Sequence, residues 1–158
     1  MIHTATIESL RKSRDAVLNY FDVAEVDLAK SYAPGKWTAR QILLHLADVE
    51  FVYLWRLCRA SAEPGSDVEG FDQDKWVAAL QYDTRSLGVG ECLFSAARDR
   101  VIELLASTDE AGLVREVVHS EAGSMTLAKV AHVLDFHTWH HIEQIEAAIK
   151  GEVWTPKK

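Results

Sequence analysis

Residues 127–150 constrain the fold most, because they have the pattern of one long amphipathic helix that carries four of the chain's seven histidines. At about 100° per residue, the apolar side chains of this stretch form a single stripe, made of Val130, Leu134, Ile145 and Ala148. His137 and His141 lie one turn apart within the stripe, and Gln144 points the same way. Side chains at i and i+4 converge, which is the spacing at which two helical imidazoles can bind one metal ion.

Inward-pointing histidines also have an ordinary structural explanation. A core histidine is stable when a neighbour satisfies its ring N–H, and the HxxxH spacing arises by chance in many helices. His140 lies on the edge of the stripe, where it is either a proton carrier or a surface residue. His132 falls on the opposite side, which a helix of a water-soluble protein turns toward solvent. A metal site therefore requires a third histidine from another element.

Residues 38–59 predict a second long helix that supplies this histidine. Thr38 is a good N-cap, and Gln41 three residues later completes a capping box. His45 lies in the middle of an apolar stripe of this helix. Asp48 lies on the stripe's edge, where it either orients a liganding imidazole or is an ordinary surface acid.

The same helix carries a second apolar stripe, formed by Leu43, Ala47, Leu54 and Cys58 with Phe51 beside them. A helix that is apolar on two sides is buried on two sides. It is therefore either central to the protein or in contact with another subunit. Because two-fold dimers are the commonest oligomers, we expect a homodimer.

The remaining segments complete an all-α chain. Apolar periodicity predicts two more long helices and one short one, over residues 4–22, 91–107 and 71–81. Asp72 is the N-cap expected for the short helix, and residues 61–70 form a loop rich in glycine with one proline. Only residues 114–119 have strand-like character, and we expect a short extended excursion there. Four long amphipathic helices predict a four-helix bundle in a single domain spanning residues 1–158.

The composition disfavours several classes of function. The 24 acidic and 17 basic residues give a net charge of −7, which argues against nucleic acid as a partner because phosphate binding needs clustered Lys and Arg. No apolar run approaches the roughly 18 residues of a membrane span, and the N-terminus lacks a signal-peptide core, so we expect a cytoplasmic protein without a membrane partner. Cys58 and Cys92 are expected to be buried free thiols.

His45, His137 and His141 together supply three nitrogen donors with no fourth protein ligand in view. Bundles place metal sites in the core between facing helices. Structural zinc sites normally fill all four positions, whereas three-histidine sites leave one position open for water or substrate. We therefore expect a divalent cation with an open position. Zinc and nickel both suit imidazole ligands.

Three segments resemble the DinB-like superfamily in their order and spacing, namely APGKWTARQILLHLADVE, GFDQDKW and HxxHHxxQI. The resemblance covers about residues 34–150. It implies an up-down-down-up four-helix bundle, often dimeric, with a divalent metal held by one histidine of the second long helix and an HxxxH pair of the last. By motif position these residues are His45, His137 and His141. Characterised members include S-transferases and isomerases that use thiols such as bacillithiol or mycothiol, and many others are called metal-dependent hydrolases.

These observations lead us to expect a metal-dependent enzyme that acts on a small-molecule substrate. Transfer of a low-molecular-weight thiol is the favoured reaction, and hydrolysis is the alternative. Coordination can hold a thiol as thiolate or lower the pKa of water, and the fold does not choose between them. His140 and Asp48 are the candidate catalytic proton carriers. The alternative is a non-catalytic bundle with a structural metal, which serves as an interaction or stress-response protein.

Two further kinds of residue have an open role. Arg56 lies on the same helix face as His45, where it either meets a substrate carboxylate or forms a salt bridge at the rim. Four tryptophans are expected to be core or interface residues rather than a platform for substrate, namely Trp37, Trp55, Trp76 and Trp139.

Overall fold

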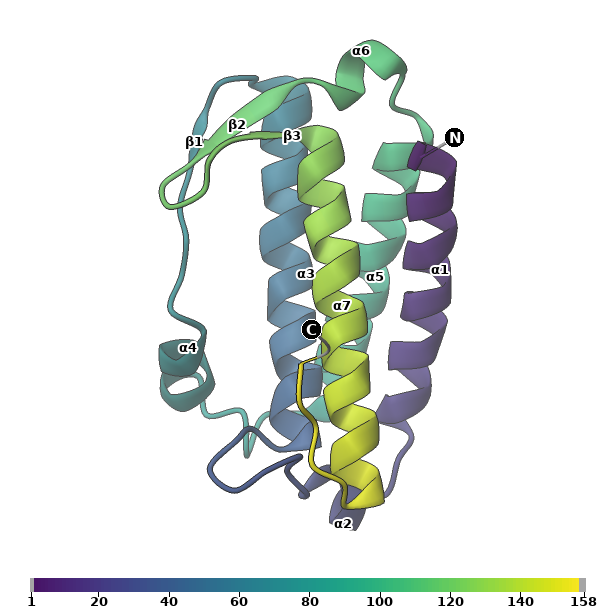
Figure 1. Ribbon diagram of the computed structural model, residues 1–158, viewed down its shortest axis with the longest axis vertical. Coiled ribbons are helices and arrows are strands. Elements are labelled where there is room, and N and C mark those ends of the chain that lie inside the picture. The colour runs from purple at the N-terminus through teal and green to yellow at the C-terminus, as the bar shows by residue number, and fades with distance from the viewer. Residues whose placement is uncertain (1, 157–158) are drawn as a thin grey trace.

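The computed structural model describes residues 2–156 of the chain, and the side chains of residues 4–156. Its frame is four long helices: α1 (Ile2–Phe21), α3 (Ala39–Ala62), α5 (Leu87–Ala106) and α7 (Leu127–Lys150). The helices α3 and α5 run in one direction, and α1 and α7 run in the other (Figure 1). This order is up-down-down-up, so the predicted bundle and its topology are confirmed.

The two parallel neighbours α3 and α5 require a connection that returns along the bundle. Residues 63–86 make this crossover on the outside of the bundle (Figure 1), and they contain β1 (Asp67–Val68) and α4 (Gln73–Ala79). The crossover brings α4 back toward the end of the bundle where α3 begins, and α2 (Glu25–Leu28) lies at that end too (Figure 1). Connecting segments from two parts of the chain therefore gather at one end of the bundle.

A small sheet covers the bundle near its other end (Figure 1). After α6 (Glu110–Leu113), the strand β2 (Glu116–His119) pairs in parallel with β1 and antiparallel with β3 (Gly123–Thr126). Sequence periodicity predicted the extended excursion of β2. It did not predict the pairing with β1, because that contact joins two loops far apart in the chain.

The helix ends have the capping chemistry that the sequence predicts. Thr38 Oγ1 accepts a hydrogen bond from the backbone of Gln41 at 3.1 Å, and the Gln41 side chain accepts one from the backbone N–H of Thr38 at 2.9 Å. Asp72 caps α4 by accepting from the backbone of Lys75 at 3.0 Å. The helix α5 begins at Leu87, before the predicted residue 91, because Ser86 caps it and accepts a hydrogen bond from the backbone of Val89.

Buried apolar side chains form two main clusters, and a polar layer lies in the interior with them. At the centre of this layer is Arg98, which is 0% exposed. Its guanidinium makes two 2.7 Å hydrogen bonds to the carboxylate of Glu50. It also donates to the carbonyl of Leu10 at 3.1 Å, to Ser13 Oγ at 2.8 Å and to Thr138 Oγ1 at 2.9 Å. All five N–H donors of the guanidinium are thus matched, and the acceptors lie on α1, α3 and α7.

One expectation from the sequence is wrong, and two others remain predictions. Cys58 and Cys92 are exposed rather than buried, because their positions on α3 and α5 face away from the core. The second apolar stripe of α3 is divided, since Leu43 and Ala47 are buried inside the subunit while Phe51 is 57% exposed. The homodimer therefore remains a prediction. Among the described residues, every helix is too short or too polar to cross a membrane, and the cytoplasmic location also remains a prediction.

We predict that Arg98→Met destabilises the fold by about 3–5 kcal/mol, because it leaves the buried carboxylate of Glu50 without its partner. The double variant Glu50→Leu/Arg98→Met should recover most of this loss, since it removes both charges from the interior. Urea unfolding of the two variants and the wild type measures the difference. A double variant as unstable as the single one would show that the charge pair is not the reason for the loss.

Candidate metal centre

Three histidines from two helices converge in the interior of the bundle. The Nε2 atom of His137 lies 3.3 Å from Nε2 of His45 and 3.2 Å from Nε2 of His141. One ring nitrogen of each histidine lies within 4.8 Å of those of the other two. The structure therefore brings together the three side chains that periodicity directed inward.

Local structure explains why the histidines meet. The capping box at Thr38 fixes the first turn of α3, and His45 follows two turns later. On α7, His137 and His141 are separated by one turn. Thr138, next to His137, is held by Arg98, so the central polar layer fixes the rotation of α7 about its axis.

The spacing of the three nitrogens suits a divalent cation. In a tetrahedral site with metal–nitrogen bonds of about 2.0–2.1 Å, neighbouring donors lie about 3.3–3.4 Å apart. The 3.3 and 3.2 Å separations around His137 come close to this value. Within the described part of the chain, no fourth His, Cys, Asp or Glu belongs to the group. The donor set thus fits a cation with at least one position left open.

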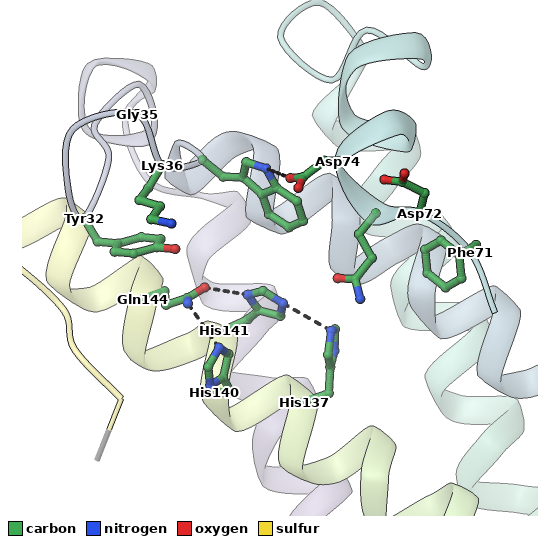
Figure 2. A pocket seen from close by; sticks show the side chains of 12 residues that line it. Tyr32, Gly35, Lys36, Phe71, Asp72, Asp74, His137, His140, His141 and Gln144 are labelled. Carbon is green, nitrogen blue, oxygen red and sulfur yellow. Dashed lines mark hydrogen bonds between the residues drawn. The ribbon is translucent and has the colours of Figure 1, made fainter. Parts of the chain in front are cut away.

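Gln144 links the centre to His140. The Gln144 side-chain oxygen lies 2.7 Å from Nδ1 of His141, and its nitrogen lies 3.1 Å from Nε2 of His140 (Figure 2). An amide oxygen only accepts and an amide nitrogen only donates, so His141 carries its proton on Nδ1. Its Nε2 lone pair therefore faces the other two histidines. Helical periodicity predicted that Gln144 points into the protein, but it did not predict these two hydrogen bonds.

The other two imidazoles of the centre are held by packing rather than by polar partners. Nδ1 of His45 and Nδ1 of His137 are buried and have no hydrogen-bond partner among residues 4–156. Trp37 packs against His45 with 4.8 Å between ring centroids. It also stacks on His141, with 6.1 Å between centroids and 15° between ring planes.

Burial keeps all three imidazoles neutral. Desolvation, together with the neighbouring histidines, lowers the pKa of His45 to about 2 and that of His137 to about 3. The pKa of His141 falls to about 4, mainly through burial, although its hydrogen bond with Gln144 opposes the change. Metal ligation requires the neutral form with a free lone pair. At neutral pH the folded chain presents that form at all three positions.

A cavity of about 610 Å³ opens onto the centre at His137 and His141, and His140 also lines it (Figure 2). Gln144 of α7 also lines it, and connecting segments form the rest of its wall, with Tyr32, Lys36, Trp37, Phe71, Asp72, Gln73 and Asp74 among the residues. The Trp37 indole donates a hydrogen bond to Asp74 at 3.0 Å, so it belongs to the wall of a cavity as well as to the core. Sequence periodicity missed this role because it depends on contacts between connectors.

The two predicted proton carriers lie in different places. His140 lines the cavity and packs edge-on against Trp154, with 4.6 Å between ring centroids. Asp48 lies apart from the histidines, because its position on α3 turns it toward Tyr82 and α5. Its carboxylate accepts a hydrogen bond from the Tyr82 hydroxyl, and it lines a separate cavity of about 240 Å³. The structure therefore does not bring Asp48 to the centre.

Comparison with known proteins identifies relatives over most of the chain. The model of the DinB superfamily matches residues 9–145. A protein of Oceanobacillus iheyensis, named "Putative metal-dependent hydrolase", is 28% identical over 133 residues. These residues make up 84% of this chain and 77% of that protein.

Solved structures share the architecture at lower sequence identity. YfiT from Bacillus subtilis, described as "a probable metal-dependent hydrolase with an unusual four-helix bundle topology", matches with a TM-score of 0.86 and 20% identity, covering 94% of this chain and 86% of YfiT. A mycothiol-dependent maleylpyruvate isomerase matches with a TM-score of 0.73 and 14% identity, covering 90% of this chain and 60% of the isomerase. At these identities, the matches establish the fold.

We predict that the metal-free protein loses stability as the pH falls below about 6.5. The unfolded histidines titrate near 6.5, whereas His45, His137 and His141 titrate near 2, 3 and 4 in the fold. Between these values the unfolded chain binds protons that the folded chain does not. The free energy of unfolding should thus fall by up to about 1.4 kcal/mol per pH unit for each histidine.

Urea unfolding of chelator-treated protein between pH 7.5 and 5 measures this slope. His45→Leu should reduce the slope by up to about one third, because one of the three most strongly shifted histidines is removed. His132→Gln should leave it unchanged, because His132 is exposed. A wild-type stability that stays flat over this range would contradict the burial of neutral histidines.

Proposed function

Because the chain belongs to the DinB superfamily, we propose that it is a metal-dependent enzyme whose divalent cation is held by His45, His137 and His141. The convergence of three neutral ring nitrogens beside an open cavity carries this proposal. A non-catalytic structural metal would normally have four protein ligands. Among the described residues, only three potential ligands form the group.

The surrounding residues support the chemistry of such a centre. A bound cation would act as a Lewis acid and lower the pKa of a water or thiol in the open position. Gln144 keeps the proton of His141 on Nδ1, which leaves Nε2 free for the cation. Trp37 covers His45 and His141 on one side, and so limits the access of water.

His140 is the proposed proton carrier. Burial lowers its pKa, although Glu143 opposes the change, so the imidazole is neutral at pH 7. Its Nε2 atom accepts a hydrogen bond from the amide of Gln144 and therefore holds a lone pair. A proton released in the cavity can bind there once the Gln144 amide turns away. Asp48 has no part in this proposal, because it faces a different cavity.

We propose transfer of a low-molecular-weight thiol as the reaction, with zinc or nickel as the metal. The cavity of about 610 Å³ is much larger than a water molecule requires. Its wall carries Lys36, Asp72 and Asp74, which suit a polar thiol cosubstrate. The thiol sulfur would attack an electrophilic carbon, the leaving group would depart, and the thiol proton would pass to His140.

Hydrolysis is the second candidate reaction. It is favoured by the relative in Oceanobacillus iheyensis, which is named "Putative metal-dependent hydrolase" and matches 84% of this chain. The same centre would then lower the pKa of water instead of a thiol. The two reactions differ only in the nucleophile, so assays with and without thiols can separate them.

We predict that His45→Ala, His137→Ala and His141→Ala each weaken metal binding by more than about 100-fold. Changes to residues that only form hydrogen bonds to a metal ligand already lower the metal affinity by about 10–100-fold. His132→Ala should retain the metal, because His132 is exposed on the outer side of α7. Elemental analysis of protein purified without an affinity tag, followed by titration with zinc or nickel, provides the measurement. Full occupancy in all three variants would reject these ligands.

We predict that the metal-loaded protein accelerates the reaction of bacillithiol, mycothiol or cysteine with a fluorogenic alkylating reagent. His45→Ala should abolish the acceleration, and His132→Ala should preserve it, because only the first changes the donor group. A parallel panel of esters and amides, assayed without thiol, tests hydrolysis. Activity toward neither panel, in protein shown to carry metal, would favour the non-catalytic alternative.

A further inference from the structure

Two arginines of the bundle are more than nine-tenths buried, but only one of them has its charge paired. Arg98 is 0% exposed and Arg56 is 6% exposed. Arg98 forms an ion pair with Glu50 at 2.7 Å. In contrast, Nη2 of Arg56 donates to the backbone carbonyl of Glu69 at 2.6 Å, and Nε is buried with no hydrogen-bond partner in the described chain. No carboxylate of the described residues pairs with Arg56 within 4.0 Å.

The surroundings of Arg56 compensate its charge only partly. The guanidinium carbon lies 5.0 Å from the centroid of the Tyr53 ring, which provides a cation–π contact. Glu121 is exposed and close enough to affect Arg56 through its charge, but it forms no ion pair with it. A buried cation is unfavourable unless it is paired and hydrogen-bonded. The position of Arg56 is therefore suited to an anion that the protein itself does not supply.

Arg56 lies on the walls of two cavities that differ in character. The first, of about 130 Å³, is also lined by Phe71, Gln73 and His137, which line the large cavity of the metal centre as well. The second, of about 280 Å³, is mainly apolar and is lined by residues of the sheet and of α7, including Val117, Met125, Val130 and Val133. Arg56 is thus placed between the histidines and an apolar compartment.

We propose that Arg56 is the anion-binding residue of a substrate subsite, which takes the carboxylate of a small molecule whose apolar part occupies the cavity of about 280 Å³. A carboxylate matches the planar donor pattern of a guanidinium. It also carries a single charge, which the nearby Glu121 repels less than it would repel a doubly charged phosphate. That this molecule is a substrate rests on the proposed function, whereas its binding does not.

The probe for this subsite is hexanoate, with the uncharged hexanamide as its matched control. Calorimetric titration at constant ionic strength should detect hexanoate binding to the wild type, and hexanoate should raise the melting temperature, because a ligand of the folded state stabilises it. Arg56→Met should weaken hexanoate binding by at least about 30-fold, since a buried charge partner is lost. Hexanamide should bind both proteins equally. Glu121→Gln should tighten hexanoate binding, because it removes a negative charge that lies near Arg56 and would repel the bound carboxylate.

Further variants keep the test decisive. Arg59→Gln removes a cation one turn along α3 that already pairs with Glu63 at 2.8 Å, so hexanoate binding should not change. Arg56→Lys keeps the charge and should retain part of the affinity. If circular dichroism shows that Arg56→Met is unfolded, Arg56→Gln takes its place. The proposal is overturned if hexanoate does not bind, or if it binds equally well to the folded Arg56 variants.

The titration is repeated on chelator-treated protein and on His45→Ala, since a metal can bind a carboxylate directly. Binding that depends on Arg56 in these metal-free forms supports the subsite even if the proposed metal chemistry fails. Binding that disappears with the metal and is unaffected by Arg56→Met assigns the carboxylate to the metal centre and rejects the subsite.

Discussion

The guanidinium of Arg98 and the carboxylate of Glu50 face each other in the middle of the bundle, where both side chains are almost completely buried. Their bonds extend to α1 through Ser13 and to α7 through Thr138, so all four long helices meet at one charged group. Apolar packing alone tolerates small rotations of a helix, whereas five directed donors do not. The network therefore sets the rotation of α7, and His137 is the neighbour of Thr138 in sequence.

The candidate centre follows from this frame and from burial. Once α3 and α7 are fixed, the Nε2 atoms of the three imidazoles lie so close together that they cannot all carry a proton. Desolvation keeps them neutral, which is also the state that a cation requires. The same interior contains Arg56, whose charge has no carboxylate partner within 4.0 Å in the part of the chain described. One buried cation thus fixes the scaffold, and the other is suited to binding a ligand.

Features set by nearby residues could be predicted from the sequence. The capping box of Thr38, the cap at Asp72 and the one-turn spacing of His137 and His141 depend on neighbours within a few positions. Helical periodicity also directed His45 inward, because the apolar stripe around it is continuous. The resemblance supplied the up-down-down-up order, which periodicity does not determine.

Features set by contacts between distant segments could not be predicted. Trp37 lines the cavity because the crossover returns α4 to the start of α3 and places Asp74 beside the indole. Asp48 lies on the edge of the histidine stripe, yet its carboxylate accepts a hydrogen bond from Tyr82 and lines a separate cavity. Gln144 is a local exception, since its partners His140 and His141 lie within four residues of it. Helical periodicity predicts that its side chain points inward, but not the side-chain rotamers that decide which atoms it contacts. The pairing of Arg98 with Glu50 likewise depends on two helices, α5 and α3, that come into contact only in the folded protein.

The most direct test of a three-histidine centre with an open position is X-ray absorption spectroscopy of the zinc-loaded protein. We expect three imidazole nitrogens at about 2.0–2.1 Å and one further light atom that is not imidazole. Addition of a small thiol should replace that light atom with sulfur at about 2.3 Å while the three imidazoles remain. A spectrum with two or fewer imidazoles, or with a fourth ligand from the protein that no thiol displaces, would contradict it.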